Sequence, residues 1–268
     1  MVRLPAVAGT FYPDNPRELS RQIQDLVQIE AVSGKISCRA CLVPHAGYMY
    51  SGHVAAAVYS RLALPNRIIV LGVRHFPQGA EAAVLSEGAW RTPLGDVSID
   101  SELAARISGA CPQLREDSVA HEGEHSLEVQ LPFLQVLNPG FTFVPIALGT
   151  LHFDELVSVG TSLGNILSSE PDVLLLTTSD FNHYEDDATT RRKDHLAMER
   201  IQQFDPGGLF EVCRKEKVSM CGLGPAVAML TALNCLGSRQ ADLAKYATSA
   251  EITGDRSAVV GYAGMLFR

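Results

Sequence analysis

The feature that most constrains the fold of this chain is the alternation of short apolar runs with longer helix-period segments. Residues 67–72 (RIIVLG) and 172–178 (DVLLLTT) are continuous apolar runs, which is typical of strands buried on both faces of a sheet. Residues 17–29 instead repeat Leu19, Ile23 and Leu26 at helical spacing. An order of strand then helix predicts a mixed, largely parallel α/β sheet with helices on both faces.

The remaining segments continue this alternation. Further strands are expected at 38–44, 141–148, 241–251 and 258–267, and further helices at 51–62, 100–108, 125–137, 154–168, 188–203, 206–215 and 224–236. No internal repeat, low-complexity tract or linker interrupts the pattern, and the composition does not shift along the chain. We therefore expect one α/β domain over residues 1–268.

Charge and composition exclude several classes of function. The chain has 22 Lys and Arg against 30 Asp and Glu, a formal net charge of −8, and no basic cluster, so we expect no nucleic-acid partner. No stretch approaches the roughly 18 consecutive apolar residues of a membrane span, so no membrane partner is expected. Residues 1–18 lack the apolar segment of a signal peptide. The six cysteines are therefore expected to be reduced thiols of a cytoplasmic protein.

Three of the expected strands are each followed, within a few residues, by a histidine. His45 follows 38–44, His75 follows 67–72 and His183 follows 172–178. Ligands of open α/β sheets bind beyond the carboxyl ends of the strands. One such histidine is more often a hydrogen-bonded loop residue, but three that converge favour a site for a transition metal such as iron, zinc or copper.

An anionic ligand is expected to complete such a metal site. The candidates are Asp180, Glu128 and Cys221. Cys221 directly precedes an expected helix, whose N-terminal dipole favours the thiolate. His125 is expected to open the helix 125–137, which would direct His125 and Glu128 at the same region.

Other cysteine and histidine patterns are expected to be structural. Cys38 and Cys41 have CxxC spacing, but they fall inside an expected strand and no second pair follows. Residues 121–125 (HEGEH) formally match the zincin pattern, but Gly123 interrupts the helix that this pattern requires. His195 is expected on a solvated helix face. The chain also contains no GxSxG, Walker or GxGxxG motif.

Six short motifs occur in an order that resembles one known family. They are 8–13 (AGTFYP), 44–48 (PHAGY), 91–95 (RTPLG), 124–128 (EHSLE), 179–184 (SDFNHY) and 221–222 (CG). Together they resemble the Memo family, also called AmmeMemoRadiSam system protein B, over essentially the whole chain. Memo proteins are similar in fold to class III extradiol dioxygenases, which implies a single α/β domain with a mixed central sheet between helical layers.

The resemblance also implies a metal site. Class III extradiol dioxygenases hold non-haem Fe(II) with two histidines and a carboxylate, and use a further histidine as acid and base. On this resemblance His45 and His75 are the histidine ligands, and Cys221 stands where the carboxylate would be. Asp180 and His183 lie beside the metal, with His183 as the acid/base group.

Four more residues are expected around the metal or in contact with substrate: His125, Glu128, Tyr48 and Arg74. The family loop before His75 usually reads Gly-Pro-Asn/Ser-His, whereas residues 72–75 here read GVRH. Arg74 therefore adds a fixed cation, which would either contact an anionic ligand or form a salt bridge with a nearby surface acid. A thiolate in place of a carboxylate softens the site and favours copper or zinc relative to iron.

The leading hypothesis is a metal-dependent redox enzyme of the dioxygenase type, with Fe(II) favoured as cofactor and copper or zinc as alternatives. A second hypothesis is a mononuclear zinc hydrolase with Asp180 or His183 as base. A third is a non-catalytic protein that binds a small molecule or peptide in the same cleft, since Memo relatives are described as binding phosphotyrosine peptides. The family's other name implies a functional link to a radical-SAM protein.

Overall fold

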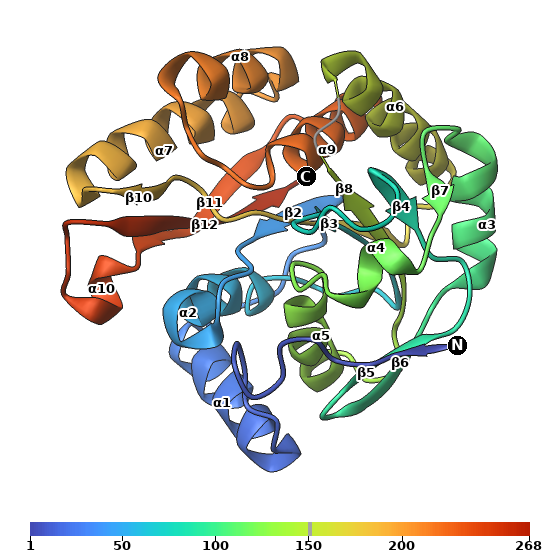
Figure 1. Cartoon of the computed structure of the whole chain (residues 1–268), viewed down its shortest axis with the longest axis horizontal. Helices are drawn as coiled ribbons and strands as arrows, with labels where there is room; N and C mark the ends of the chain where they lie inside the picture. The colour runs from blue at the N-terminus through green and yellow to red at the C-terminus, as the bar shows by residue number, and fades with distance from the viewer. Residues whose placement is uncertain (150–151) are drawn as a thin grey trace.

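The computed structural model describes residues 1–149 and 152–268, which form a mixed β-sheet between layers of helices (Figure 1). The strands are β1 (Val2–Arg3), β2 (Ala40–Val43), β3 (Arg67–Val73), β4 (Ala82–Val84), β5 (Ala89–Thr92), β6 (Gly95–Ser98), β7 (Arg115–Glu116), β8 (Thr142–Leu148), β9 (Val173–Thr178), β10 (His183–Glu185), β11 (Ala241–Thr248) and β12 (Val259–Phe267). The helices are α1 (Pro16–Ile29), α2 (Tyr48–Tyr59), α3 (Ser101–Ala110), α4 (Val119–Glu122), the 3-10 helix η1 (Glu128–Gln130), α5 (Leu131–Leu137), α6 (Phe153–Ser169), α7 (Asp187–Gln202), α8 (Pro206–Glu216), α9 (Leu223–Cys235) and α10 (Ala250–Thr253).

The central sheet has the strand order β10-β12-β2-β9-β3-β8-β4-β7, with β11 paired to β12. Its middle strands β2, β9, β3 and β8 are parallel, whereas β12 and β4 run antiparallel to their neighbours β2 and β8. Val43 pairs with Thr178, and Leu71 pairs with Thr177. The three strands β2, β9 and β3 therefore end almost level with one another, at one edge of the sheet.

The middle strands of the sheet consist largely of apolar residues that are buried on both faces of the sheet. Every residue of β2 and β9 is buried, as is every residue of β3 after Arg67. Helix α9 packs on β2, β3 and β9 beside α6, while α1, α2 and α5 lie on the opposite side of the sheet (Figure 1). The expected mixed α/β architecture with helices on both faces is confirmed. None of the described helices is both long and apolar enough to cross a membrane.

The structure differs from the expected helices and strands where the apolar period of the sequence is weak. The strands β1, β4, β5, β6, β7 and β10 were not expected, because each is only two to four residues long. Strands β1, β4, β7 and β10 pair only with segments distant in the sequence, whereas β5 and β6 form a short hairpin with each other. The helix expected over 125–137 begins only at Glu128 as η1, and α5 follows with Pro132 in its first turn. The strand expected to end at residue 251 ends at Thr248.

Helix α7 buries part of the charged run in which His195 lies. His195 itself is exposed, as expected, but the neighbouring Lys193 and Asp194 are buried. Lys193 pairs with Glu185 at 2.6 Å, and Asp194 accepts a hydrogen bond from the Tyr246 hydroxyl at 2.7 Å. A run of charged residues can be buried in this way because each charge has a partner.

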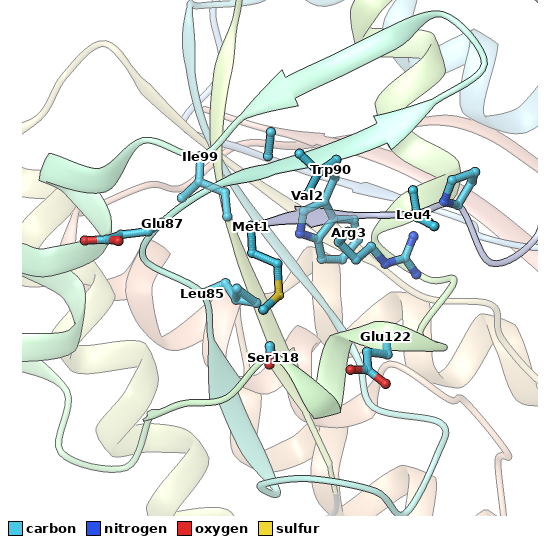
Figure 2. A pocket seen from close by; sticks show the side chains of 12 residues that line it. Met1, Val2, Arg3, Leu4, Leu85, Glu87, Trp90, Ile99, Ser118 and Glu122 are labelled. Carbon is cyan, nitrogen blue, oxygen red and sulfur yellow. The ribbon is translucent and has the colours of Figure 1, made fainter.

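A cavity of about 380 Å³ lies beside β1 and β5 (Figure 2). Its lining is largely apolar and includes Met1, Leu85, Trp90 and Ile99. None of the site residues expected from the sequence lines it. The candidate site is therefore sought elsewhere, at the carboxyl edge of the parallel strands.

The contact between α6 and α9 depends on a glycine. A Cβ atom at Gly160 would lie 2.4 Å from the backbone oxygen of Ala228. We expect Gly160→Ala to lower the free energy of unfolding by about 1–3 kcal/mol, because the overlap is with backbone that cannot move cheaply. The same substitution at Gly109 in α3 meets no atom within 4 Å and should be neutral or stabilise by up to about 1 kcal/mol. Urea denaturation measures both, and equal midpoints for the two variants would contradict the prediction.

Candidate metal centre

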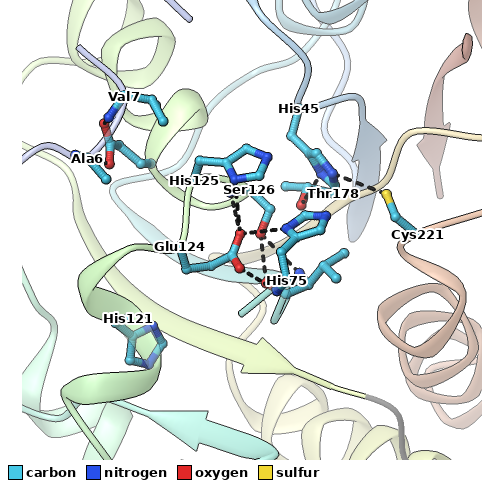
Figure 3. Close-up of polar contacts among 12 residues, drawn as sticks. Ala6, Val7, His45, His75, His121, Glu124, His125, Ser126, Thr178 and Cys221 are labelled. Atoms are coloured by element: carbon cyan, nitrogen blue, oxygen red, sulfur yellow. Dashed lines mark hydrogen bonds and ion pairs between the residues drawn. The ribbon is translucent and has the colours of Figure 1, made fainter. Parts of the chain in front are cut away.

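His45, His75 and Cys221 come together at the edge where β2, β9 and β3 end (Figure 3). One potential ligand atom from each lies within 4.8 Å of the other two. The Nε2 atom of His45 is 3.1 Å from the Sγ atom of Cys221, and the two imidazole centroids are 5.2 Å apart. The structure thus brings together the three residues that the resemblance implies as ligands.

Cys221 reaches this edge because the residue after it is glycine. A Cβ atom at Gly222 would lie 2.4 Å from Ser179 Cβ and 2.5 Å from Thr178 O. The Gly222 amide also donates to Ser179 Oγ at 2.9 Å. The segment before α9 can therefore lie directly against the end of β9.

Each imidazole is held through its Nδ1 atom. His45 Nδ1 lies 3.0 Å from the hydroxyl of Thr178, and His75 Nδ1 lies 2.9 Å from Glu124 Oε1. The other Glu124 oxygen accepts the backbone amide of His75 at 2.6 Å. In both rings the nitrogen left for a metal is Nε2, which is the arrangement that outer hydrogen bonds give to metal-binding histidines.

Glu124 was not expected at the site. Burial raises the pKa of its carboxyl group, but the hydrogen bonds and charge of His75, with the amide of Ser126, lower it to about 2. The group is therefore a carboxylate that can accept from His75. The only signal in the sequence is its place beside His125, and nothing there connects it to His75, which lies 49 positions earlier.

Asp180 and His183 also lie at this edge. Asp180 is buried and accepts the backbone amide of His45 at 2.8 Å, and burial raises the pKa of its carboxyl group to about 6 despite its backbone hydrogen bonds. The Asp180 amide donates to Cys221 Sγ at 3.3 Å. His183 Nδ1 is 2.8 Å from the backbone oxygen of Ser219, and burial lowers the pKa of this imidazole.

The expected effect of the helix dipole on Cys221 is outweighed by burial. Burial raises the pKa of the Cys221 thiol well above its usual range, and the nearby Asp180 raises it further. Without a metal the side chain is therefore a thiol, because its location disfavours charge. A bound metal ion reverses this preference, since a coordinating thiol loses its proton.

A cavity of about 380 Å³ opens on His45, His75, Asp180 and His183, while Cys221 lies outside its lining. His125 lines it, stacked on His75 at a centroid separation of 4.6 Å, with burial lowering the pKa of its imidazole to about 4. His121, the other histidine of the zincin-like pattern, lies apart in the four-residue helix α4 (Figure 3). The residues that line the cavity are Thr10, Phe11, His45, Ala46, Gly47, Met49, Tyr50, His75, His125, Asp180, His183, Tyr184, Val260 and Tyr262.

The structure directs Glu128 away from this cavity. Its carboxylate forms an ion pair with Arg3 and accepts hydrogen bonds from the amides of Ala6 at 2.8 Å and Val7 at 3.1 Å and from the Tyr12 hydroxyl at 2.5 Å. Glu128 lies near enough for its charge to act on His125, as expected, but it does not line the cavity, and the helix begins after His125 and not at it. Glu128 holds the N-terminal segment.

Tyr48 and Arg74 also lie outside the lining of the cavity. The Tyr48 hydroxyl is buried and donates to the backbone oxygen of Val129 at 2.6 Å. Arg74 donates to backbone oxygens of its own loop, among them Gly79 O at 3.0 Å, and it forms no salt bridge within the described part of the chain. These contacts do not match the expected surface acid as partner, while the expected contact of Arg74 with an anionic ligand stays a prediction.

The contacts that Glu128 makes with the N-terminal segment lead to a prediction about stability. Glu128→Gln should lower the free energy of unfolding by about 3–5 kcal/mol, because it leaves the buried guanidinium of Arg3 without a counter-charge. Asp96→Asn makes the same kind of change in the exposed Arg91–Asp96 pair and should cost no more than about 1 kcal/mol. Chemical denaturation compares the two, and a loss for Glu128→Gln no larger than for Asp96→Asn would contradict the role assigned to Glu128.

Comparison with solved structures shows the fold alone. An uncharacterized protein from Escherichia coli K12 superposes with a TM-score of 0.53 at 10% sequence identity, covering 85% of this chain and 98% of that one. Closer similarity comes from sequences. A MEMO1 family protein of Methanopyrus kandleri is 39% identical over 100% of this chain and 99% of its own length, and one of Methanosarcina barkeri is 39% identical over 99% of each.

The similarity extends along nearly the whole chain. Residues 3–266 match the family described as Memo-like protein. The matched region spans every residue of the centre described above. The chain belongs to the Memo family.

Proposed function

We propose that this chain binds one metal ion through His45, His75 and Cys221 and acts as a non-haem metal-dependent redox enzyme of the dioxygenase type. The observation that carries the proposal is the donor set itself. Three potential ligand atoms lie within 4.8 Å of one another, and the remaining nitrogen of each imidazole is already held by Thr178 or Glu124. Such preorganisation is what metal-binding histidines require.

The chemistry of the donors limits the choice of metal. Two imidazoles and a thiolate suit iron, copper or zinc and disfavour magnesium and calcium, which prefer oxygen ligands. Three protein ligands leave at least one coordination position for a further ligand. A redox metal held here would supply a binding position for oxygen or for a chelating substrate. The resemblance favours Fe(II), while the thiolate keeps copper and zinc as candidates.

The chain's own groups are suited to proton transfer in the cavity. His183 has a pKa lowered by burial, so its imidazole is neutral near pH 7 and able to accept a proton. Asp180 has a pKa raised to about 6 and lies within hydrogen-bond reach of the His45 amide, so it can hold the edge of the site in place. We assign proton transfer to His183 and positioning to Asp180.

The lining of the cavity favours a small neutral ligand. Tyr50, Tyr184, Tyr262 and Phe11 supply aromatic walls, and no lysine or arginine is among the described residues that line it. Aromatic walls with a few convergent polar groups are typical of small-molecule sites. A phosphate group would lack a fixed cation here, so a phosphorylated peptide fits the cavity less well than an aromatic or hydroxyl-bearing small molecule.

Metal analysis of anaerobically purified protein tests the proposal. We expect about one equivalent of iron, copper or zinc per chain, and we expect His45→Ala and Cys221→Ser each to lose it. His195→Ala and Cys235→Ser change exposed residues of the same types and should keep the metal. Circular dichroism verifies folding. Protein that takes up no iron, copper or zinc under any loading condition would overturn the proposal.

Glu124 provides a second test. Because it orients His75, Glu124→Gln should weaken metal affinity by about 10–100-fold while the three ligands remain. Glu122→Gln changes an exposed acid two residues away and should leave the affinity unchanged. Competition with a chromophoric chelator measures both affinities. Equal affinities for the two variants would remove the role assigned to Glu124.

The soft donor set also keeps a zinc hydrolase as a second candidate function. The redox enzyme requires oxygen, whereas the zinc hydrolase does not. Oxygen uptake with catechol-like compounds by the iron-loaded protein, absent from the zinc-loaded protein, supports the redox enzyme. Turnover that survives strict anaerobiosis and zinc substitution supports the hydrolase.

A further inference from the structure

Asn182 is fully buried between the end of β9 and the segment that leads to Cys221, and both ends of its side-chain amide are hydrogen-bonded. Its Oδ1 atom accepts from the Ser219 amide at 3.0 Å and from the Ser219 hydroxyl at 3.1 Å. Its Nδ2 group donates to Glu185 Oε2 at 2.7 Å and to Thr190 Oγ1 at 3.3 Å. The amide thus connects the Ser219 segment to the elements that follow His183.

Ser219 in turn holds His183 at two points. The Ser219 hydroxyl accepts the backbone amide of His183 at 2.8 Å, and the Ser219 backbone oxygen lies 2.8 Å from His183 Nδ1. A carbonyl oxygen can only accept, so this contact requires the proton of the neutral ring to be on Nδ1. Nε2 is then the lone-pair nitrogen of a ring that lines the cavity.

The same short segment also carries the thiol ligand, because Ser219 stands two residues before Cys221. The backbone of Asn182 is also fixed, because its amide donates to the buried carboxylate of Asp194 at 2.9 Å. A displacement of Ser219 would therefore affect His183 and the approach of Cys221 together.

We propose that Asn182 is a positioning residue that holds Ser219 against His183 and so keeps the neutral His183 ring in the tautomer with the proton on Nδ1. The tautomer follows from the hydrogen bonds alone. Its catalytic consequence, a proton acceptor at Nε2 facing the cavity, rests on the function proposed above for His183.

The side chain at position 182 has to donate at one end and accept at the other. Asn182→Asp would keep an acceptor toward Ser219 but place a second carboxylate against that of Glu185, so this variant should lose only the contact with the 183–190 region. Asn182→Ala removes both ends without adding charge. Asn182→Ala therefore frees the Ser219 segment, and an imidazole without a fixed acceptor at Nδ1 exchanges between its two neutral tautomers.

Nitrogen-15 NMR of the histidine rings in the metal-free full chain tests the proposed His183 tautomer, and its dependence on Asn182, without any activity assay. Signals are assigned by their loss in His183→Gln, and spectra are recorded at pH 7.5, where the lowered pKa keeps the ring neutral. In the unaltered chain we expect His183 to show a protonated Nδ1 and an unprotonated Nε2. In Asn182→Ala we expect the Nε2 signal to shift toward the protonated value, whereas in Asn182→Asp, which keeps an acceptor for Ser219, we expect it to stay in place.

Thr190→Val is the matched control. It removes a buried hydrogen-bond partner of Asn182 Nδ2 but leaves both contacts between Oδ1 and Ser219, so the His183 signals should not move. A protonated Nε2 in the unaltered chain would overturn the proposal. So would unmoved signals in a folded Asn182→Ala chain, or shifts in Asn182→Asp or Thr190→Val equal to those in Asn182→Ala. A chain that binds no metal would overturn the function proposed above but not this tautomer.

Discussion

The parallel hydrogen bonding of β2, β9 and β3 is the constraint on which the candidate centre depends. Because the paired residues of the three strands end almost level, the residues that follow them leave the sheet at one edge. His45, Asp180 and His75 are placed there by the backbone before any side-chain contact is considered. The fourth part, Cys221, reaches the same edge from another element, and it can do so because Gly222 has no Cβ to collide with β9.

Two buried carboxylates close together in the sequence have different roles around this edge. Glu124 accepts from His75 and sets the orientation of a metal-binding ring. Glu128 holds the N-terminal segment, which places Phe11 edge-on against His125 at a centroid distance of 4.9 Å and in the wall of the cavity. Glu128 therefore contributes to the site through the wall it supports, and not by contact with metal or substrate. Each charge is stable in the interior because several donors surround it.

Three imidazoles and the thiol of the centre are kept neutral by burial. The pKa values of His45, His125 and His183 are all lowered by burial, and that of the Cys221 thiol is raised by it. On the function proposed above, a bound dication would supply the charge that the Cys221 thiolate needs. Hydrogen bonds between the Nδ1 groups of the rings and Thr178 Oγ1, Glu124 Oε1 and the Ser219 backbone oxygen leave Nε2 available.

Local patterns in the sequence were sufficient for the middle of the fold and for part of the site. Apolar runs long enough to be buried on both faces predicted β3 and β9, and the rule that carboxyl ends of parallel strands meet predicted that His45, His75 and His183 converge. The short strands β4 to β7 could not be predicted, because two to four residues carry no period, and β4 and β7 pair only with segments distant in the sequence. The contacts of Glu128 could not be predicted for a related reason, since the start of a helix decides the direction of its side chains and that start depends on tertiary contacts.

The sequence by itself determined which elements form and which chemical groups stand at their ends, because backbone propensity and apolar period act over a few neighbouring residues. Only the tertiary structure decided which of those groups meet. Glu124 and His75, or Asn182 and Ser219, are tens of residues apart, and the hydrogen bonds between them exist only once the sheet and α9 have brought distant segments within about 3 Å. Those long-range bonds, and not the histidines alone, give the centre its orientation.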